Sequence, residues 1–145
     1  MRIRILFYIT LVSIFFTSDI ANVRAAQDTE KLASNQVIAY YFHGNFRCAN
    51  CYNIEQFAKE AIHQNFKNEL ASGKLSFKII NIEGRGNEHF VNDYRLYTKS
   101  LVLSLVKNGE EVDSKNLTRI WEYLRNKARF QQYVKDEITD YLNRL

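Results

Sequence analysis

Apolar residues along this chain occur either in short continuous runs or at every third and fourth position. Residues 37–42 (VIAYYF) are apolar throughout and rich in β-branched and aromatic types, which predicts a central strand covered on both faces. Residues 75–82 predict a second strand, and the helical spacing between the two runs predicts one long helix that ends at Gly73. The apolar positions of that helix are Ile54, Phe57, Ala58, Ala61, Ile62, Phe66 and Leu70.

The second half of the chain predicts a hairpin followed by helices. After a short helix near 90–97, a strand over 101–106 leads through the turn residues Asn108 and Gly109 to a short strand near 111–112. The C-terminal part carries two helical stripes of different phase, so we expect a break near 126–129. The first stripe consists of Leu117, Ile120, Trp121 and Leu124, all expected to pack in the core.

This order of elements predicts an α/β fold. A strand, a helix and a strand in succession imply a parallel pair, and the hairpin adds two antiparallel strands. We therefore expect a three-layer domain, with a mixed four-stranded sheet flanked by helices on both faces.

The N-terminal segment has the pattern of a secretory signal peptide. Arg2 and Arg4 precede an apolar run at 5–16, and the small residues Val23 and Ala25 suit cleavage after Ala25. The run is shorter than the ~20 residues that span a bilayer, although an uncleaved anchor is the alternative. The prediction is an exported protein. Its parts are a signal peptide at 1–25, a flexible segment at 26–36 and one domain at 37–145.

Charge argues against several classes of partner. Without the first 25 residues the formal net charge falls from +4 to +2, and acidic and basic residues are mixed along the rest. No nucleic-acid or anionic-membrane partner is therefore expected. The sequence Gly84-Arg85-Gly86 lacks the spacing of a phosphate-binding loop, and we expect no small-molecule cofactor.

The only two cysteines, Cys48 and Cys51, form a C-x-x-C motif between the first predicted strand and the helix. Free backbone N–H groups and the helix dipole at that point favour a Cys48 thiolate, and the neighbouring Arg47 adds positive charge. Cys51, one turn further along, is expected to be more buried and to resolve a mixed disulfide. The favoured interpretation is a redox site with Cys48, Cys51 and Arg47 as its catalytic residues.

Two other interpretations stay open. A structural disulfide across so short a loop would restrict the unfolded chain little, by roughly 2 kcal/mol. A structural zinc site needs four ligands, but a copper(I) site made by Cys48, Cys51 and His43 is an alternative because thiolates suit that ion.

A strand followed by C-x-x-C at the start of a helix, in this order of elements, resembles the thioredoxin-like superfamily over residues 37–145. More narrowly, three segments resemble small exported bacterial proteins of the ArsF type, labelled nitrophenyl compound nitroreductase subunits: YYFHGNFRCANCYNIE, LVLSLVKNGEEV and NLTRIWEYL. This resemblance implies the bacterial periplasm or cell envelope as the place of the exported protein. The superfamily resemblance implies a thiol–disulfide oxidoreductase that exchanges disulfides with a protein partner, or receives electrons from a membrane donor. The alternative is a non-enzymatic copper(I)-binding or complex-subunit protein on the same fold.

The chain departs from the superfamily pattern at two positions. Such proteins usually have a cis-proline before the third core strand, but this chain has no proline, and the matching peptide bond joins Lys99 and Ser100. A cis bond without proline costs ~3–4 kcal/mol, so we expect a trans bond. The buried aspartate of thioredoxin itself is replaced here by Tyr40, Tyr41 and Phe42, and His43 is a candidate for its proton-carrying role.

Overall fold

The computed structural model describes residues 35–145. The expected signal peptide and most of the flexible segment lie outside the described residues. Within the described part of the chain, no helix has both the length and the apolar character to span a membrane. The elements are β1 (Gln36–His43), α3 (Ala49–Asn65), α4 (Lys67–Ala71), β2 (Leu75–Asn81), α5 (His89–Asp93), β3 (Ser100–Lys107), β4 (Glu110–Asn116), α6 (Ile120–Tyr123) and α7 (Lys127–Leu142).

The strands form one mixed sheet in the order β2-β1-β3-β4. β1 is parallel to β2 and antiparallel to β3, and β3 and β4 form the expected hairpin. Its turn places Asn108 (φ 54°) and Gly109 (φ 81°) in the left-handed region, which is the requirement of a tight hairpin turn. The predicted α/β fold with a mixed four-stranded sheet is therefore confirmed.

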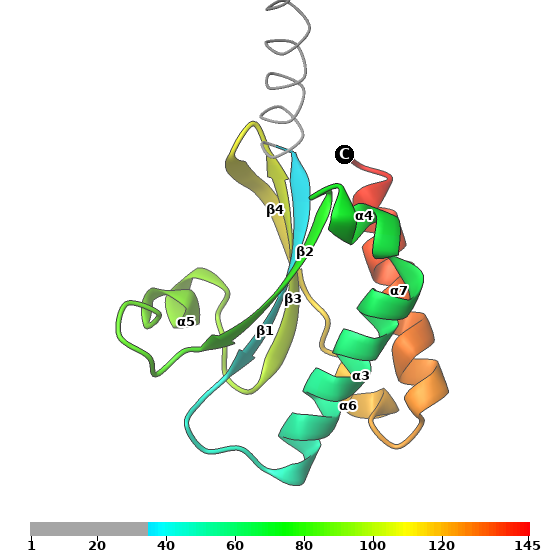
Figure 1. Ribbon diagram of the computed structural model, residues 1–145. Coiled ribbons are helices and arrows are strands. Elements are labelled where there is room, and N and C mark those ends of the chain that lie inside the picture. Colours follow the sequence, from blue (N-terminus) through cyan, green and yellow to red (C-terminus); the bar gives the residue numbers. More distant parts are fainter. Residues whose placement is uncertain (1–34) are drawn as a thin grey trace, which may run out of the picture. The chain divides into compact units, whose positions relative to one another are not determined.

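Helices cover both faces of the sheet. Figure 1 shows α3, α4, α6 and α7 on one side and the short α5 on the other. Alternate residues of β1 supply the two faces, because successive side chains of a strand point in opposite directions. Val37, Ala39 and Tyr41 are fully buried in the larger core with α3 and α7, whereas Phe42 is fully buried in the smaller core beside α5.

The first helical segment is shorter than the sequence predicts. One continuous helix was expected up to Gly73, but α3 ends at Asn65 and α4 follows after a break at Phe66 (φ −128°, ψ 40°). The Asn65 side chain donates to the carbonyl of Ala61 (2.7 Å), and such local side-chain bonds compete with the helical ladder. The break still leaves Phe66 buried in the larger core.

Two further elements differ in length from the prediction. α5 ends at Asp93, before the expected 97, because Arg95 adopts a left-handed backbone conformation (φ 49°). β4 runs from Glu110 to Asn116, well beyond the predicted 111–112. Its side chains are mostly polar because it is an edge strand, so the hydrophobic pattern does not show it. The expected break before α7 is confirmed, with the Asn126 side chain accepting from the N–H of Arg129 (3.0 Å).

Candidate functional site: a dithiol at the start of a helix

Both cysteines lie in the first turn of α3, after the loop that leaves β1. Cys48 is the N-cap residue, with an extended backbone (φ −91°, ψ 170°), and Cys51 is the third residue of the helix. The Cys48 N–H donates to Cys51 Sγ (3.1 Å), and the Cys51 N–H donates to Cys48 Sγ. This is a capping box in which two sulfur atoms replace the usual side-chain oxygens. The atoms that cap the helix are therefore the same atoms that carry the candidate chemistry.

The two thiols differ in exposure. Cys48 is exposed, whereas Cys51 is fully buried, as its position one turn into the helix predicts. Both cysteines are free, and their Sγ atoms lie 2.7 Å apart. The hydrogen bond from the Cys51 thiol, followed by that from the Cys51 backbone N–H, lowers the pKa of the Cys48 thiol. Cys48 is therefore accessible and favoured as a thiolate, which are the two requirements of a nucleophile.

The lowered pKa predicts a pH profile for alkylation of Cys48. The thiolate reacts and the thiol does not, so the rate of iodoacetamide labelling should rise with pH and level off above the pKa. Its midpoint should lie below the ~8.5 of a free cysteine. In Cys51→Ala the midpoint should move upward, because the sulfur hydrogen bond is lost. Mass spectrometry of the labelled peptide measures the rate at Cys48, and an unchanged midpoint in Cys51→Ala would contradict the assignment.

Arg47 makes its contacts with groups other than the Cys48 sulfur. Its guanidinium pairs with Glu55 and lies 4.3 Å from the centre of the Tyr52 ring. The main interactions that lower the pKa of the Cys48 thiol come from Cys51, not from Arg47. The stabilisation of the thiolate by Arg47 therefore stays a prediction, and the contacts of Arg47 favour a different role.

The site includes two residues that the sequence analysis did not assign to it. Tyr41 is fully buried, and its hydroxyl donates to the carbonyl of Cys51 (2.6 Å). Glu55, the partner of Arg47, lies one turn after Cys51 on α3. The spacing of four residues from Cys51 was a signal that could have identified Glu55. Tyr41 had no such signal, because a tyrosine in an apolar strand has the pattern of any core residue.

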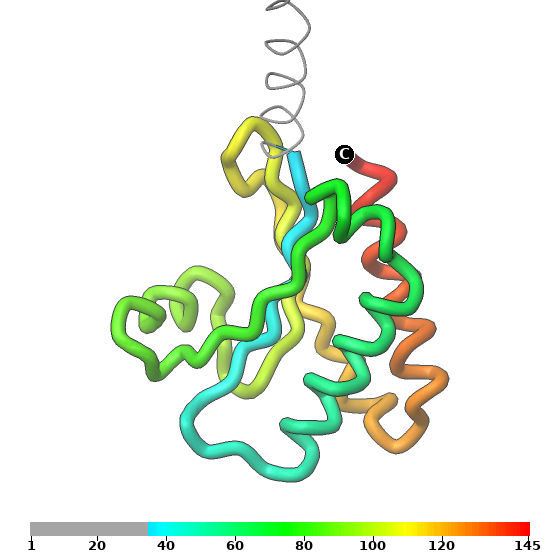
Figure 2. Tube along the Cα trace, viewed as in Figure 1, coloured from blue at the N-terminus to red at the C-terminus, as the bar shows by residue number. Residues whose placement is uncertain are grey.

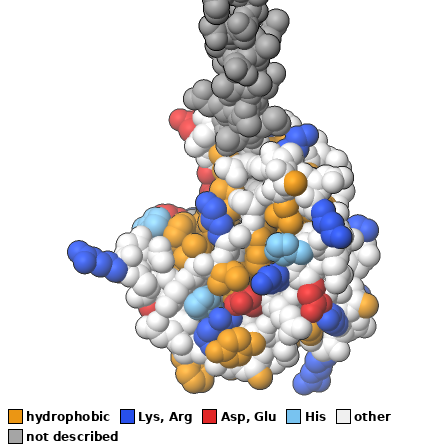
Figure 3. All heavy atoms as spheres, in the orientation of Figure 1, with side chains coloured by type: hydrophobic (Ala, Val, Ile, Leu, Met, Phe, Trp, Pro, Cys, Tyr) orange, Lys and Arg blue, Asp and Glu red, His pale blue; other side chains and the backbone are white. Residues whose placement is uncertain are grey.

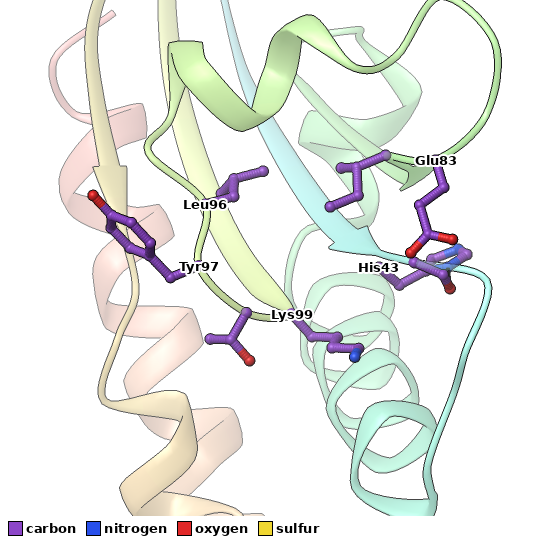
Figure 4. Close-up of a pocket in the computed structure, with 8 residues that line it drawn as sticks. His43, Glu83, Leu96, Tyr97 and Lys99 are labelled. Carbon is purple, nitrogen blue, oxygen red and sulfur yellow. Dashed lines mark hydrogen bonds between the residues drawn. The ribbon is translucent and has the colours of Figure 1, made fainter.

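His43 does not join the cysteines. Its Nδ1 forms a hydrogen bond with the carbonyl of Gly44 (2.9 Å), and Figure 4 shows it close to Glu83 in a cavity of about 150 Å³ that Lys99 also lines. Within residues 35–145, no three His, Cys, Asp or Glu side chains gather as a metal site would require. The alternative copper site of Cys48, Cys51 and His43 is therefore not assembled in this structure.

The start of β3 lies at the same end of the sheet as the loop after β1, as Figure 2 shows. The Lys99 to Ser100 bond is trans, as expected, since the described residues contain no cis peptide. Lys99 Nζ lies 6.0 Å from the centre of the Phe46 ring, and the Lys99 carbonyl accepts from Trp121 Nε1 (3.2 Å). The expected burial of Trp121 is wrong: the residue is 37% exposed, because its indole N–H bonds to a loop carbonyl at the surface.

The architecture consists of a parallel strand pair, an antiparallel hairpin and a closing helix, with a dithiol at the start of the helix after β1. The fold is thioredoxin-like. Similar solved structures include the oxidised thioredoxin of Plasmodium falciparum, with 15% identity, a TM-score of 0.44 and coverage of 78% of this chain and 91% of that one. The reduced thioredoxin pre-protein of Schistosoma mansoni has 16% identity, a TM-score of 0.44 and coverage of 83% and 90%.

The thioredoxin of Fasciola hepatica is similar at 22% identity, with a TM-score of 0.39 and coverage of 70% of this chain and 93% of that one. No protein-family model and no curated protein matches the chain. At these identities and TM-scores the comparisons assign no role to any residue, so the roles of individual residues rest on the geometry of the site itself.

Proposed function

We propose that this protein is a thiol–disulfide oxidoreductase in which Cys48 is the attacking cysteine and Cys51 is the resolving cysteine. One observation carries the proposal: an exposed Cys48 Sγ lies 2.7 Å from the buried Sγ of Cys51 at the start of α3. The helix N-terminus and the sulfur hydrogen bonds favour the thiolate that the first step needs.

The reaction proceeds in two balanced steps. In the first, the Cys48 thiolate attacks one sulfur of a partner disulfide, a mixed disulfide forms, and the other partner sulfur leaves as a thiolate. In the second, the Cys51 sulfur attacks Cys48 Sγ, the new bond joins Cys48 and Cys51, and the partner's second sulfur leaves. The protons that Cys48 and Cys51 lose to solvent are matched by those that the two departing thiolates take up from it. The two cysteines carry both electrons, so the exchange itself needs no further cofactor, and the reverse sequence oxidises a partner dithiol.

The partner in this proposal is a protein thiol or disulfide, with a membrane electron donor as the source of reducing equivalents. Export to the periplasm or cell envelope is part of the same proposal, and it is supported by the pattern of residues 1–25. The narrower resemblance to ArsF-type nitroreductase subunits likewise remains a proposal, carried by the three quoted sequence segments.

Exposed aromatic side chains at the end of the sheet where β1 leads into the dithiol loop support a protein partner. Phe46 is 77% exposed and Tyr97 is 95% exposed, and the loops that carry them leave the same end of the sheet. Figure 3 shows hydrophobic side chains next to Lys, Arg and His side chains on the lower part of the face in view. Exposed aromatic groups provide contact area for a partner segment.

The experiment that tests the proposed function is equilibration of residues 26–145 with glutathione, followed by quantification of the reduced and oxidised forms. A potential of about −120 to −180 mV would identify a disulfide donor or isomerase, and about −270 mV a reductant with an upstream electron source. A dithiol that glutathione does not oxidise, or that exchanges with no protein disulfide, would overturn the proposal. Copper measured in protein purified under reducing conditions provides the second arm. One equivalent of copper that Cys48→Ser removes would favour the copper(I) alternative instead.

A further inference from the structure

The residue before the candidate nucleophile is held tightly by α3. The Arg47 side chain is only 17% exposed, and its guanidinium is ion-paired with Glu55 and stacked on the Tyr52 ring at 4.3 Å. Its Nε is buried and has no hydrogen-bond partner among the described residues. A cation placed to attract a thiolate would not need these contacts. They instead attach the loop before Cys48 to the first two turns of α3.

A second contact holds the first turn of α3 from the side of the sheet. The Tyr41 hydroxyl on β1 donates to the Cys51 carbonyl at 2.6 Å, and Tyr41 is fully buried beneath the helix. The guanidinium carbon of Arg47 lies 5.9 Å from the centre of the Tyr41 ring. The main chain of Cys51 is thereby joined to β1 through Tyr41. The loop before Cys48 is joined to Glu55 of α3 through Arg47.

We propose that Tyr41, Arg47 and Glu55 are positioning residues for Cys51, and that they control the resolution step and not the attack by Cys48. The inference rests on the proposed function and assigns these three residues to its second step. Cys51 is fully buried and attacks from within the structure, so its sulfur can reach Cys48 only if the first turn of α3 keeps its place. Small displacements of a reacting group have large kinetic effects, up to about a hundredfold for 1 Å.

The attack step depends less on these contacts. Cys48 is exposed, and a partner disulfide can approach it from solvent in many orientations. The hydrogen bonds that favour its thiolate come chiefly from Cys51 and the helix backbone. Loss of the Arg47 charge should therefore change the first step little.

The test is stopped-flow mixing of the reduced protein with an aromatic disulfide reagent that releases a coloured thiol. The first equivalent of coloured thiol reports attack by Cys48, and the second reports resolution by Cys51. The mixing is done at a pH well above the pKa of the Cys48 thiol, so that Cys48 is fully ionised in every variant. In Arg47→Lys the second step should then slow by about tenfold or more, while the first stays within about twofold. Lysine keeps the charge but cannot reproduce the planar stacking and pairing of the guanidinium. Tyr41→Phe and Glu55→Gln should show the same selective loss.

Arg144 provides the matched control, because its guanidinium also pairs with a carboxylate, that of Asp113, and lies over a tyrosine ring, that of Tyr141. Asp113 is in register with the start of β1, at the other end of the sheet from the dithiol, so Arg144→Lys should leave both steps unchanged. An unchanged second step in Arg47→Lys and Tyr41→Phe would overturn the inference. Equal slowing of both steps would also overturn it, since that result indicates general disruption. Slowing of the first step alone would overturn it as well, because Arg47 would then act on Cys48. A wild-type protein that releases no coloured thiol would instead refute the proposed function, so the two failures are distinguishable.

Discussion

Cys48→Ser should abolish disulfide exchange, because it removes the only thiol of the pair that a partner can reach. Cys51 remains, but its side chain is fully buried and cannot attack a disulfide on another molecule. The expected result is no detectable reduction of a protein disulfide and no trapped partner. The measurement is turnover with a reducing system, together with non-reducing electrophoresis.

The matched variant is Cys51→Ser, which should behave differently. Cys48 stays exposed and can still form the mixed disulfide. The Cys51 sulfur that lies 2.7 Å from Cys48 Sγ in the wild-type protein is missing, so no second thiol displaces the partner. Mixed disulfides should therefore accumulate in Cys51→Ser and be absent in Cys48→Ser. Equal amounts in both variants would contradict the assignment of the attacking and resolving roles.

Phe130→Ala should lower the free energy of unfolding by about 3–5 kcal/mol, the range for truncation of a buried phenylalanine. Phe130 is fully buried on α7, and its ring packs edge-on against Phe57 of α3 with centroids 5.6 Å apart. Truncation leaves a cavity between the helix that carries the dithiol and the helix that covers it. Since small domains are stable by only about 5–15 kcal/mol, this is a large fraction of the total.

Urea unfolding followed by circular dichroism measures this change, and Tyr97→Ala is its control. Tyr97 loses a comparable aromatic ring at a position that is 95% exposed, so the free energy of unfolding should change by no more than about 0.5 kcal/mol. If the free energy of unfolding of Phe130→Ala falls by as little as that of Tyr97→Ala, the packing of α7 on α3 contributes little to stability.

The elements that hydrophobic pattern predicts well are those buried on a regular face. β1 was predicted because every residue at 37–42 is apolar, and a central strand covered by helices on both sides requires that pattern. The hairpin turn was predicted because Asn108 and Gly109 tolerate positive φ. The elements that differed from prediction are those whose ends or length depend on polar groups. Asn65 interrupts a helix, and β4 carries charged side chains at the edge of the sheet.

The candidate site also has a part that could be predicted from the sequence and a part that could not. The order of residues was enough to place Cys48 and Cys51 in the first turn of a helix, because motif spacing and helix position are local properties of the chain. The groups that surround the two cysteines depend on the packing of elements that are distant in the chain. That packing pairs Arg47 with Glu55 and joins the Tyr41 hydroxyl to the Cys51 carbonyl, while His43 bonds to the Gly44 carbonyl and forms no metal-binding group with the two cysteines. These contacts depend on how β1 packs against α3, and a list of residues in order does not contain that packing.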